Sequence, residues 1–258
     1  MQQSTSALVV LAASTLLGAA VQAGTGFGFA IIAAPAFLYA IDGLEAVPIL
    51  VALHLVQSAM LVPRLWSAVP RTEFDKLILG AAIGCVLGIA VFQFLDLRSL
   101  KLSIGIVILM MTALLAWRRW HPGAKFRDGG GDGPNEVPPG RSSGLIAGAL
   151  SGAMTAILVM PGPPLMLYLL RRPIPAVQAR ALSLTLFAVC YAVVFVLHLA
   201  TKGLSGHGWQ LAAILAPLVV PATWGGERLF RLLTPATYWP VLLILLLLSG
   251  LGAIASVL

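Results

Sequence analysis

Long apolar segments follow one another along nearly the whole chain, with short polar stretches between them. In the first half they cover residues 6–23, 27–41, 46–66, 77–95 and 102–117. In the second half they cover 145–159, 164–170, 176–200, 209–223 with an extension, and 238–258. Most approach the ~20 residues that a helix needs to cross a bilayer. The pattern predicts an all-α polytopic membrane protein with a single transmembrane domain over residues 1–258.

Composition supports this prediction, because 59% of the residues are hydrophobic and only 10% are charged. Soluble domains carry about a quarter charged residues. A net charge of +7 would point to nucleic acid in a soluble protein, but in a membrane protein it reports topology. We therefore expect a lipid bilayer and no nucleic acid among the partners. Cys85 and Cys190 lie in apolar runs without a Cys/His cluster, so no metal and no cofactor are expected.

The two halves share residues at a nearly constant offset, which predicts an internal duplication. The proposed repeats are residues 1–119 and 144–258, joined by the Gly- and Pro-rich linker 120–143. Chance matching in apolar sequence is the alternative explanation. The matched residues are Gly18 with Gly148, Pro35 with Pro164, Tyr39 with Tyr168, Ala46-Val47 with Ala176-Val177, and Gly80, Gly84 and Gly88 with Pro217, Pro221 and Gly225.

The segments 27–41 and 164–170 are too short to cross a membrane. A helix of 15 residues extends ~22 Å, whereas the hydrocarbon core is ~30 Å thick. We expect each short segment to pair with the segment before it in a broken or re-entrant unit that returns to its own side. Three spanning helices then follow in each half, so the second repeat must be inverted relative to the first.

Basic residues separate into two unequal groups under this topology. The minor group has three members, Arg98, Lys101 and Lys202. We expect the protein in the inner membrane of the cell. The positive-inside rule places the larger group on the cytoplasmic side, together with the linker 120–143, and both termini on the outside. The larger group consists of Arg64, Arg71, Lys76, Arg118, Arg119, Lys125, Arg127, Arg141, Arg171, Arg172, Arg228 and Arg231.

Glycines and prolines interrupt both short units, in "AGTGFGFAIIAAPAFLYA" (23–40) and "VMPGPPLMLYLL" (159–170). A break at membrane depth lets a new helix begin there, with free N–H groups and a positive dipole end. Two such helix starts converging near the midplane would bind an anion. Close packing of helices through small residues is the competing explanation. The substrate-binding candidates at the breaks are Gln22, Gly24, Thr25, Gly26, Gly28, Gly162 and Pro163.

Three polar residues within the long segments complete the candidate site. Arg180 lies near the second break in sequence, where its guanidinium would grip an oxyanion with two parallel N–H groups. Snorkelling to the interface is the alternative. His54 and Gln57 lie midway along 46–66, where polar side chains either serve a function or satisfy one another between helices.

These segments resemble the sulfite exporter TauE/SafE family of membrane transporters. The resemblance rests on "GAAVQAGTGFGFAIIAAPAFLYA", "GPPLMLYLLRRPIPAVQARALSL" and "PATWGGERLFRLLTPATYWPVLLILLLLSGL". It implies transport of small sulfur-containing anions such as sulfite and sulfonates, with other organic acids handled by some members. The run "MTAILVMPGPP" departs from the more glycine-rich stretch that is usual in that family.

We therefore expect a secondary transporter for a small anion, sulfite or an organosulfonate, bound near the midplane between two broken helices. The alternatives are a passive anion channel and a carrier of a non-sulfur organic acid. An enzyme is not expected, because the chain has no HExxH motif, Ser/Lys or Asp dyad, or His/Cys cluster. The sequence leaves open the direction of transport, the coupling ion (proton or sodium) and the oligomeric state, with a homodimer as one option.

Overall fold

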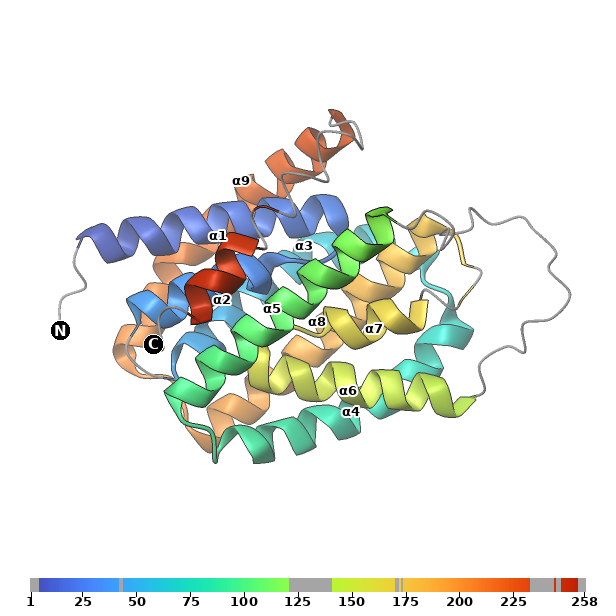
Figure 1. Ribbon diagram of the computed structural model, residues 1–258, viewed down its shortest axis with the longest axis horizontal. Coiled ribbons are helices and arrows are strands. Elements are labelled where there is room, and N and C mark those ends of the chain that lie inside the picture. Colours follow the sequence, from blue (N-terminus) through green and yellow to red (C-terminus); the bar gives the residue numbers. More distant parts are fainter. Residues whose placement is uncertain are drawn as a thin grey trace, which may run out of the picture.

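The computed structural model describes residues 5–41, 44–120, 141–169, 172, 174–232, 244 and 247–254, and the regular structure in them is helical, without strands (Figure 1). The all-α prediction is confirmed. Most of the predicted linker and of the last apolar segment lies outside these residues. The helices are α1 (Thr5–Thr25), α2 (Phe29–Ala40), α3 (Ala46–Leu65) with the 3-10 turn η1 (Trp66–Ala68), α4 (Arg71–Phe92), α5 (Leu97–Trp120), α6 (Arg141–Leu158), α7 (Gly162–Leu169), α8 (Ala176–Thr201) and α9 (Gly206–Leu232), and residues 247–254 are also helical.

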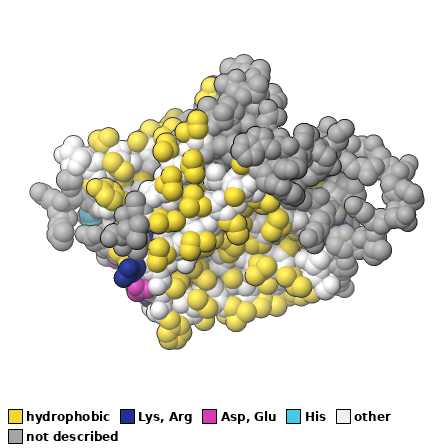
Figure 2. Space-filling view, in the orientation of Figure 1, with side chains coloured by type: hydrophobic (Ala, Val, Ile, Leu, Met, Phe, Trp, Pro, Cys, Tyr) yellow, Lys and Arg dark blue, Asp and Glu magenta, His cyan; other side chains and the backbone are white. Residues whose placement is uncertain are grey.

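Five segments of the described chain are long and apolar enough to cross a membrane: Thr5–Thr25, Ala46–Ala68, Arg71–Phe92, Leu97–Leu114 and Val177–Thr201. Their outward side chains are apolar as well. Leu87 of α4 is 58% exposed and Val196 of α8 is 63% exposed. In Figure 2, which has the orientation of Figure 1, most of the coloured side chains on the described surface are hydrophobic, and charged side chains lie near its edge. Such a surface is stable against lipid rather than water.

The two short helices turn back toward the side from which their partners start. α2 has 12 residues and α7 has 8, or ~18 Å and ~12 Å of helix. Figure 1 shows α2 running back toward the end of the molecule where α1 begins, and α7 toward the end where α6 begins. The hydroxyl of Tyr168, at the end of α7, donates to the carboxylate of Glu73 at the start of α4. Gly144, near the start of α6, lies beside the same hydroxyl.

Helices of the two halves pack in a reciprocal way. α1 packs along α9, and α6 packs along α4, while α3 and α8 contact each other. Under the predicted duplication, α6 corresponds to α1, α8 to α3 and α9 to α4. Each half therefore places its first helix against the fourth helix of the other half, as a two-fold relation would require. The inversion of the repeats within a membrane stays a prediction.

Glycines allow the backbones of α4 and α6 to touch. A Cβ added to Gly84 would lie 1.9 Å from the carbonyl oxygen of Ala149, and one added to Gly148 would lie 2.1 Å from that of Leu77. In the matching pair, α9 meets α1 through Gly226, where a Cβ would lie 2.3 Å from the carbonyl oxygen of Ala20. The sequence match had selected Gly225, but its Cβ position faces open space. The face of α9 that contacts α1 is thus shifted by one residue from the face that the sequence match predicted.

We expect Gly84→Ala to destabilise the protein by about 1–3 kcal/mol or more, because the new methyl group meets backbone that no rotamer change can move. Gly225→Ala is the matched control. It also lies inside a helix but has no atom within 4 Å of the added Cβ, so it should stabilise by about 1 kcal/mol through helix propensity. Thermal unfolding in detergent measures both variants, and equal shifts would contradict the packing described for α4 and α6.

Candidate anion site

The first break lies between α1 and α2 and is built on two glycines with positive φ. Gly26 has φ 88° and Gly28 has φ 112°, in the left-handed region that glycine enters without strain. The Gln22 carbonyl oxygen accepts the Gly26 N–H at 2.8 Å. The Gln22 side-chain Oε1 accepts the Phe29 N–H at 3.3 Å, and the Thr25 hydroxyl accepts the Phe27 N–H at 3.1 Å. Side chains before the break therefore satisfy backbone that leaves helical geometry.

In the second break the residue with positive φ is a valine, whereas in the first break such residues are glycines. Val159 has φ 59°, and its N–H donates to the carbonyl oxygen of Thr155 at 3.0 Å, the five-to-one hydrogen bond of a left-handed helix end. The Met160 N–H donates to the carbonyl oxygen of Met154 at 3.3 Å. A left-handed conformation costs a residue with a Cβ roughly 1–2 kcal/mol. Pro163 lies in the first turn of α7, where a missing N–H is tolerated. The surrounding protein thus holds this break in a strained conformation.

The two breaks meet inside the protein. A Cβ added to Gly162, the first residue of α7, would lie 3.8 Å from the Cβ of Phe27 in the first break. The first turn of α2 is also enclosed, because Phe29, Ala30 and Ile31 are at most 5% exposed. In this conformation the predicted helix start is covered by side chains.

His54 lies between the two breaks and is fully buried. Its ring centroid is 4.3 Å from the ring of Phe29, after the first break, and 4.3 Å from the ring of Tyr191. The Tyr191 hydroxyl donates to the carbonyl oxygen of Val159 in the second break at 3.4 Å. His54 Nδ1 lies 2.7 Å from the Leu50 carbonyl oxygen, while Nε2 is buried without a hydrogen-bond partner. An unsatisfied nitrogen at this position is unusual and is available to a ligand.

Arg180 reaches the first break rather than the second, which its place in the sequence had favoured. A Cβ added to Gly26 would lie 3.2 Å from Arg180 Cγ. The Arg180 Nη2 donates to the carbonyl oxygen of Ala23 and to Glu227 Oε1, the latter at 3.1 Å. Arg180 Nε is buried without a partner. Because the breaks meet in the core, the start of α8 can contact the break of the other half.

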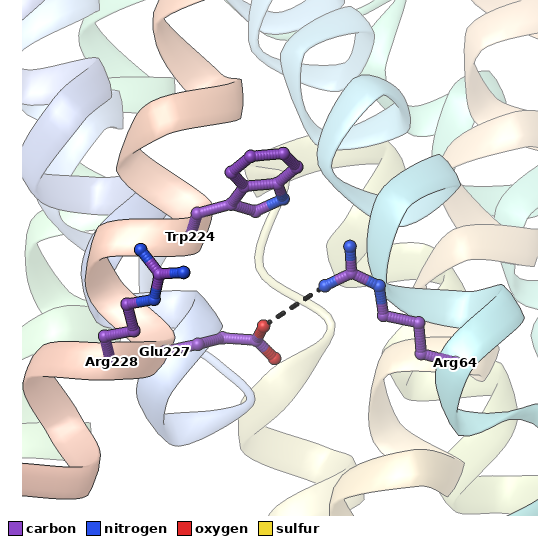
Figure 3. Close-up of a pocket in the computed structure, with 4 residues that line it drawn as sticks. All are labelled: Arg64, Trp224, Glu227 and Arg228. Carbon is purple, nitrogen blue, oxygen red and sulfur yellow. Dashed lines mark hydrogen bonds and ion pairs between the residues drawn. The ribbon is translucent and has the colours of Figure 1, made fainter.

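A pocket of about 270 Å³ opens beside this arginine and is lined by Arg64, Trp224, Glu227 and Arg228 (Figure 3). Glu227 points from α9 toward Arg64 at the end of α3, and Glu227 Oε2 lies 3.5 Å from Arg64 Nη1. With Arg180, three guanidinium groups surround one carboxylate. The local excess of positive charge attracts anions.

Sequence reasoning missed this pocket. Arg64 and Arg228 had been assigned to topology alone, and Glu227 had no assignment. The signal was present in "WGGERLF", where an acid and an arginine adjoin at the end of an apolar segment. The sequence did not indicate that the ends of α3 and α9 lie next to each other at this pocket.

The remaining candidates are placed differently. Gln57 Nε2 donates to the Ala19 carbonyl oxygen at 2.7 Å and to the Thr223 hydroxyl at 3.2 Å, so this side chain joins α3 to α1 and α9. Gly24 lies in the last turn of α1 and is partly buried. The structure thus gathers Gln22, Thr25, Gly26, Gly28 and Arg180 at the first break and brings Gly162 against it. Gln57 joins three helices through its amide nitrogen, while its Oε1 is buried without a hydrogen-bond partner.

Comparison with protein families decides the class. The family model described as sulfite exporter TauE/SafE matches residues 10–253, nearly the whole chain. The chain belongs to the sulfite exporter TauE/SafE family. It is therefore a multi-pass membrane anion transporter and not an enzyme. Searches of curated proteins and of solved structures gave no match.

We expect Arg180→Lys to weaken anion binding roughly ten- to a hundredfold, which corresponds to the loss of one charge-assisted hydrogen bond of about 1.5–3 kcal/mol. The ammonium keeps the charge but cannot present two parallel N–H groups. Titration of the purified transporter with methanesulfonate measures the change.

Arg71→Lys is a suitable control, because Arg71 lies at the same end of the molecule and its side chain stacks over Trp66, with no hydrogen bond or ion pair to the part of the chain that the structure describes. The partner considered in the sequence, Arg171, lies outside the described residues. Equal affinity in the two variants would remove Arg180 from the anion site.

Proposed function

We propose that this member of the family is a secondary transporter that carries sulfite or a small organosulfonate across the inner membrane. The observation that carries the proposal is the meeting of two helix breaks in the core beside Arg180. Backbone that leaves helical geometry at membrane depth is tolerated where protein encloses it or where it lines a pathway. Here the break residues are satisfied by Gln22 and Thr25 and adjoin an arginine-rich pocket.

The anion would pass from the pocket to the first break and then between the breaks past His54. Arg180 supplies a guanidinium at the first step. His54 Nε2, buried and without a hydrogen-bond partner, supplies a nitrogen at the second. Since His54 is enclosed between the breaks in the present conformation, passage requires the breaks to separate, as expected of a carrier that exposes its site alternately to each side. A proton and a sodium ion are both candidates for coupling.

The charge distribution supports a cytoplasmic position for the pocket. Arg64, Arg180 and Arg228 lie around it, whereas Lys202, against the ring of Phe92, lies at the far ends of α8 and α4. By the positive-inside rule the arginine-rich end faces the cytoplasm. The linker 120–143 would lie on that side and both termini outside.

Transport is tested with the full chain in proteoliposomes. We expect saturable uptake of radiolabelled sulfite or methanesulfonate, accelerated when unlabelled anion is present on the opposite side, because a carrier exchanges its bound anion. Uptake that never saturates and shows no such exchange would indicate a channel. Exchange of acetate but of neither sulfur anion would indicate an organic-acid carrier and overturn the proposed substrate.

Orientation is tested by labelling single introduced cysteines in intact cells. Gly130→Cys in the linker should react only after the membrane is made permeable. Arg98→Cys, exposed in the first turn of α5, should react from outside with an impermeant maleimide. The native Cys85 and Cys190 are buried and serve as an internal blank. Labelling of both introduced cysteines from one side would contradict the inverted-repeat topology, because they are separated by one crossing helix.

A further inference from the structure

Glu227 separates the pocket from the first break. One carboxylate oxygen, Oε2, faces the pocket and pairs with Arg64 Nη1 at 3.5 Å. The other, Oε1, pairs with Arg180 Nη2 at 3.1 Å, and the same Nη2 donates to the carbonyl oxygen of Ala23 beside the break. The Glu227 side chain is only 18% exposed. An anion that enters the pocket therefore meets this carboxylate before it reaches Arg180.

The carboxylate of Glu227 leaves some of the surrounding arginine N–H groups without a hydrogen-bond partner. It occupies one nitrogen of the Arg180 guanidinium, while the neighbouring Nε is buried and has no partner. Arg228 lines the same pocket and has no hydrogen bond or ion pair within the described residues. Two guanidinium groups thus share a single carboxylate beside a third, Arg228, although an arginine binds an oxyanion best through two parallel N–H groups. A compact oxyanion with three oxygens could satisfy more of these donors at once than Glu227 does.

We propose that Glu227 is an internal counter-anion, which the transported oxyanion must displace from Arg64 and Arg180 to reach the first break. The pocket of Arg64, Trp224, Glu227 and Arg228 is then the entry site for this anion. A sulfonate or sulfite group suits it, since its three oxygens can accept from Arg180 and Arg64 together. Trp224, 49% exposed, offers an apolar ring to the carbon end of an organosulfonate.

This proposal rests on the proposed function, but its test compares the anion affinities of wild-type and variant proteins and does not measure transport. Wild-type protein, Glu227→Gln and Glu227→Asp are titrated in detergent with methanesulfonate, sulfite and acetate by calorimetry. Gln retains the shape and removes the competing charge, so the anion that binds should bind about five- to tenfold more tightly. Asp keeps the charge but is one carbon shorter and cannot bridge both arginines, so we expect a smaller increase in the same direction.

Glu73→Gln is the matched control. Glu73 also lies at the arginine-rich end and pairs with Lys76 at 2.8 Å and Arg172 at 3.4 Å, so its removal changes the net charge equally without touching the pocket. We expect its anion affinity to stay within twofold of wild type. If Glu73→Gln tightens binding as much as Glu227→Gln, the effect is general electrostatics and the proposal fails.

A second pair of variants keeps the test valid if Glu227 variants unfold. Arg64→Gln should weaken binding about tenfold, whereas Arg71→Gln, which alters an arginine outside the pocket, should not. Three results would each overturn the entry site. They are unchanged affinity in Arg64→Gln, unchanged or weaker affinity in Glu227→Gln, and no anion binding by any variant. Saturable sulfite transport together with one of these results would reject the displacement of Glu227 and leave the proposed function standing.

Discussion

The requirement that backbone polar groups find partners away from water organises this molecule. Two helices stop inside an apolar protein, and each stop leaves N–H and carbonyl groups that lipid cannot satisfy. The first break solves this with Gln22, Thr25 and two glycines of positive φ, and the second with backbone hydrogen bonds from Val159 to Thr155 and from Met160 to Met154. Placing the breaks against each other hides both from lipid. The same arrangement puts the start of α8, and hence Arg180, beside the first break.

Close helix packing is what allows the breaks to meet. The backbones of α4 and α6 touch at Gly84 and Gly148, and those of α1 and α9 touch at Gly226. In lipid there is no hydrophobic force between helices, so association depends on contacts of this kind. The glycines therefore have two structural roles, at different positions. Gly26 and Gly28 shape a break, whereas Gly84, Gly148 and Gly226 bring helices together.

The arginines near the pocket serve two purposes for one physical reason. A guanidinium at a membrane surface fixes orientation through its charge and binds oxyanions through its N–H groups. Arg64 and Arg228 meet both conditions because their helices end at the same pocket. Glu227 limits the excess of charge at the site when no anion is bound, and with Arg64 and Arg180 it links α9 to α3 and α8. The proposed displacement of Glu227 by the anion would couple binding to these helix contacts.

The sequence by itself determined the helical class, the positions of the helices and both breaks. Segment length, apolar composition and the conformational preferences of Gly and Pro are local properties, so 27–41 and 164–170 were recognisable as short helices after a break. The family, too, could be recognised from the broken segments together with the tail "PATWGGERLF".

Tertiary structure alone decided which side chains share a site. Arg180 was expected at the second break and lies at the first, because the breaks cross in the core. Gln57 is a binding candidate whose amide nitrogen joins α3 to Ala19 and Thr223, a contact that the sequence did not indicate. Glu227 gained a role only when α3, α8 and α9 were seen to converge on it. Such contacts depend on how helices far apart in the chain pack, and apolar periodicity carries little information about that choice of partner.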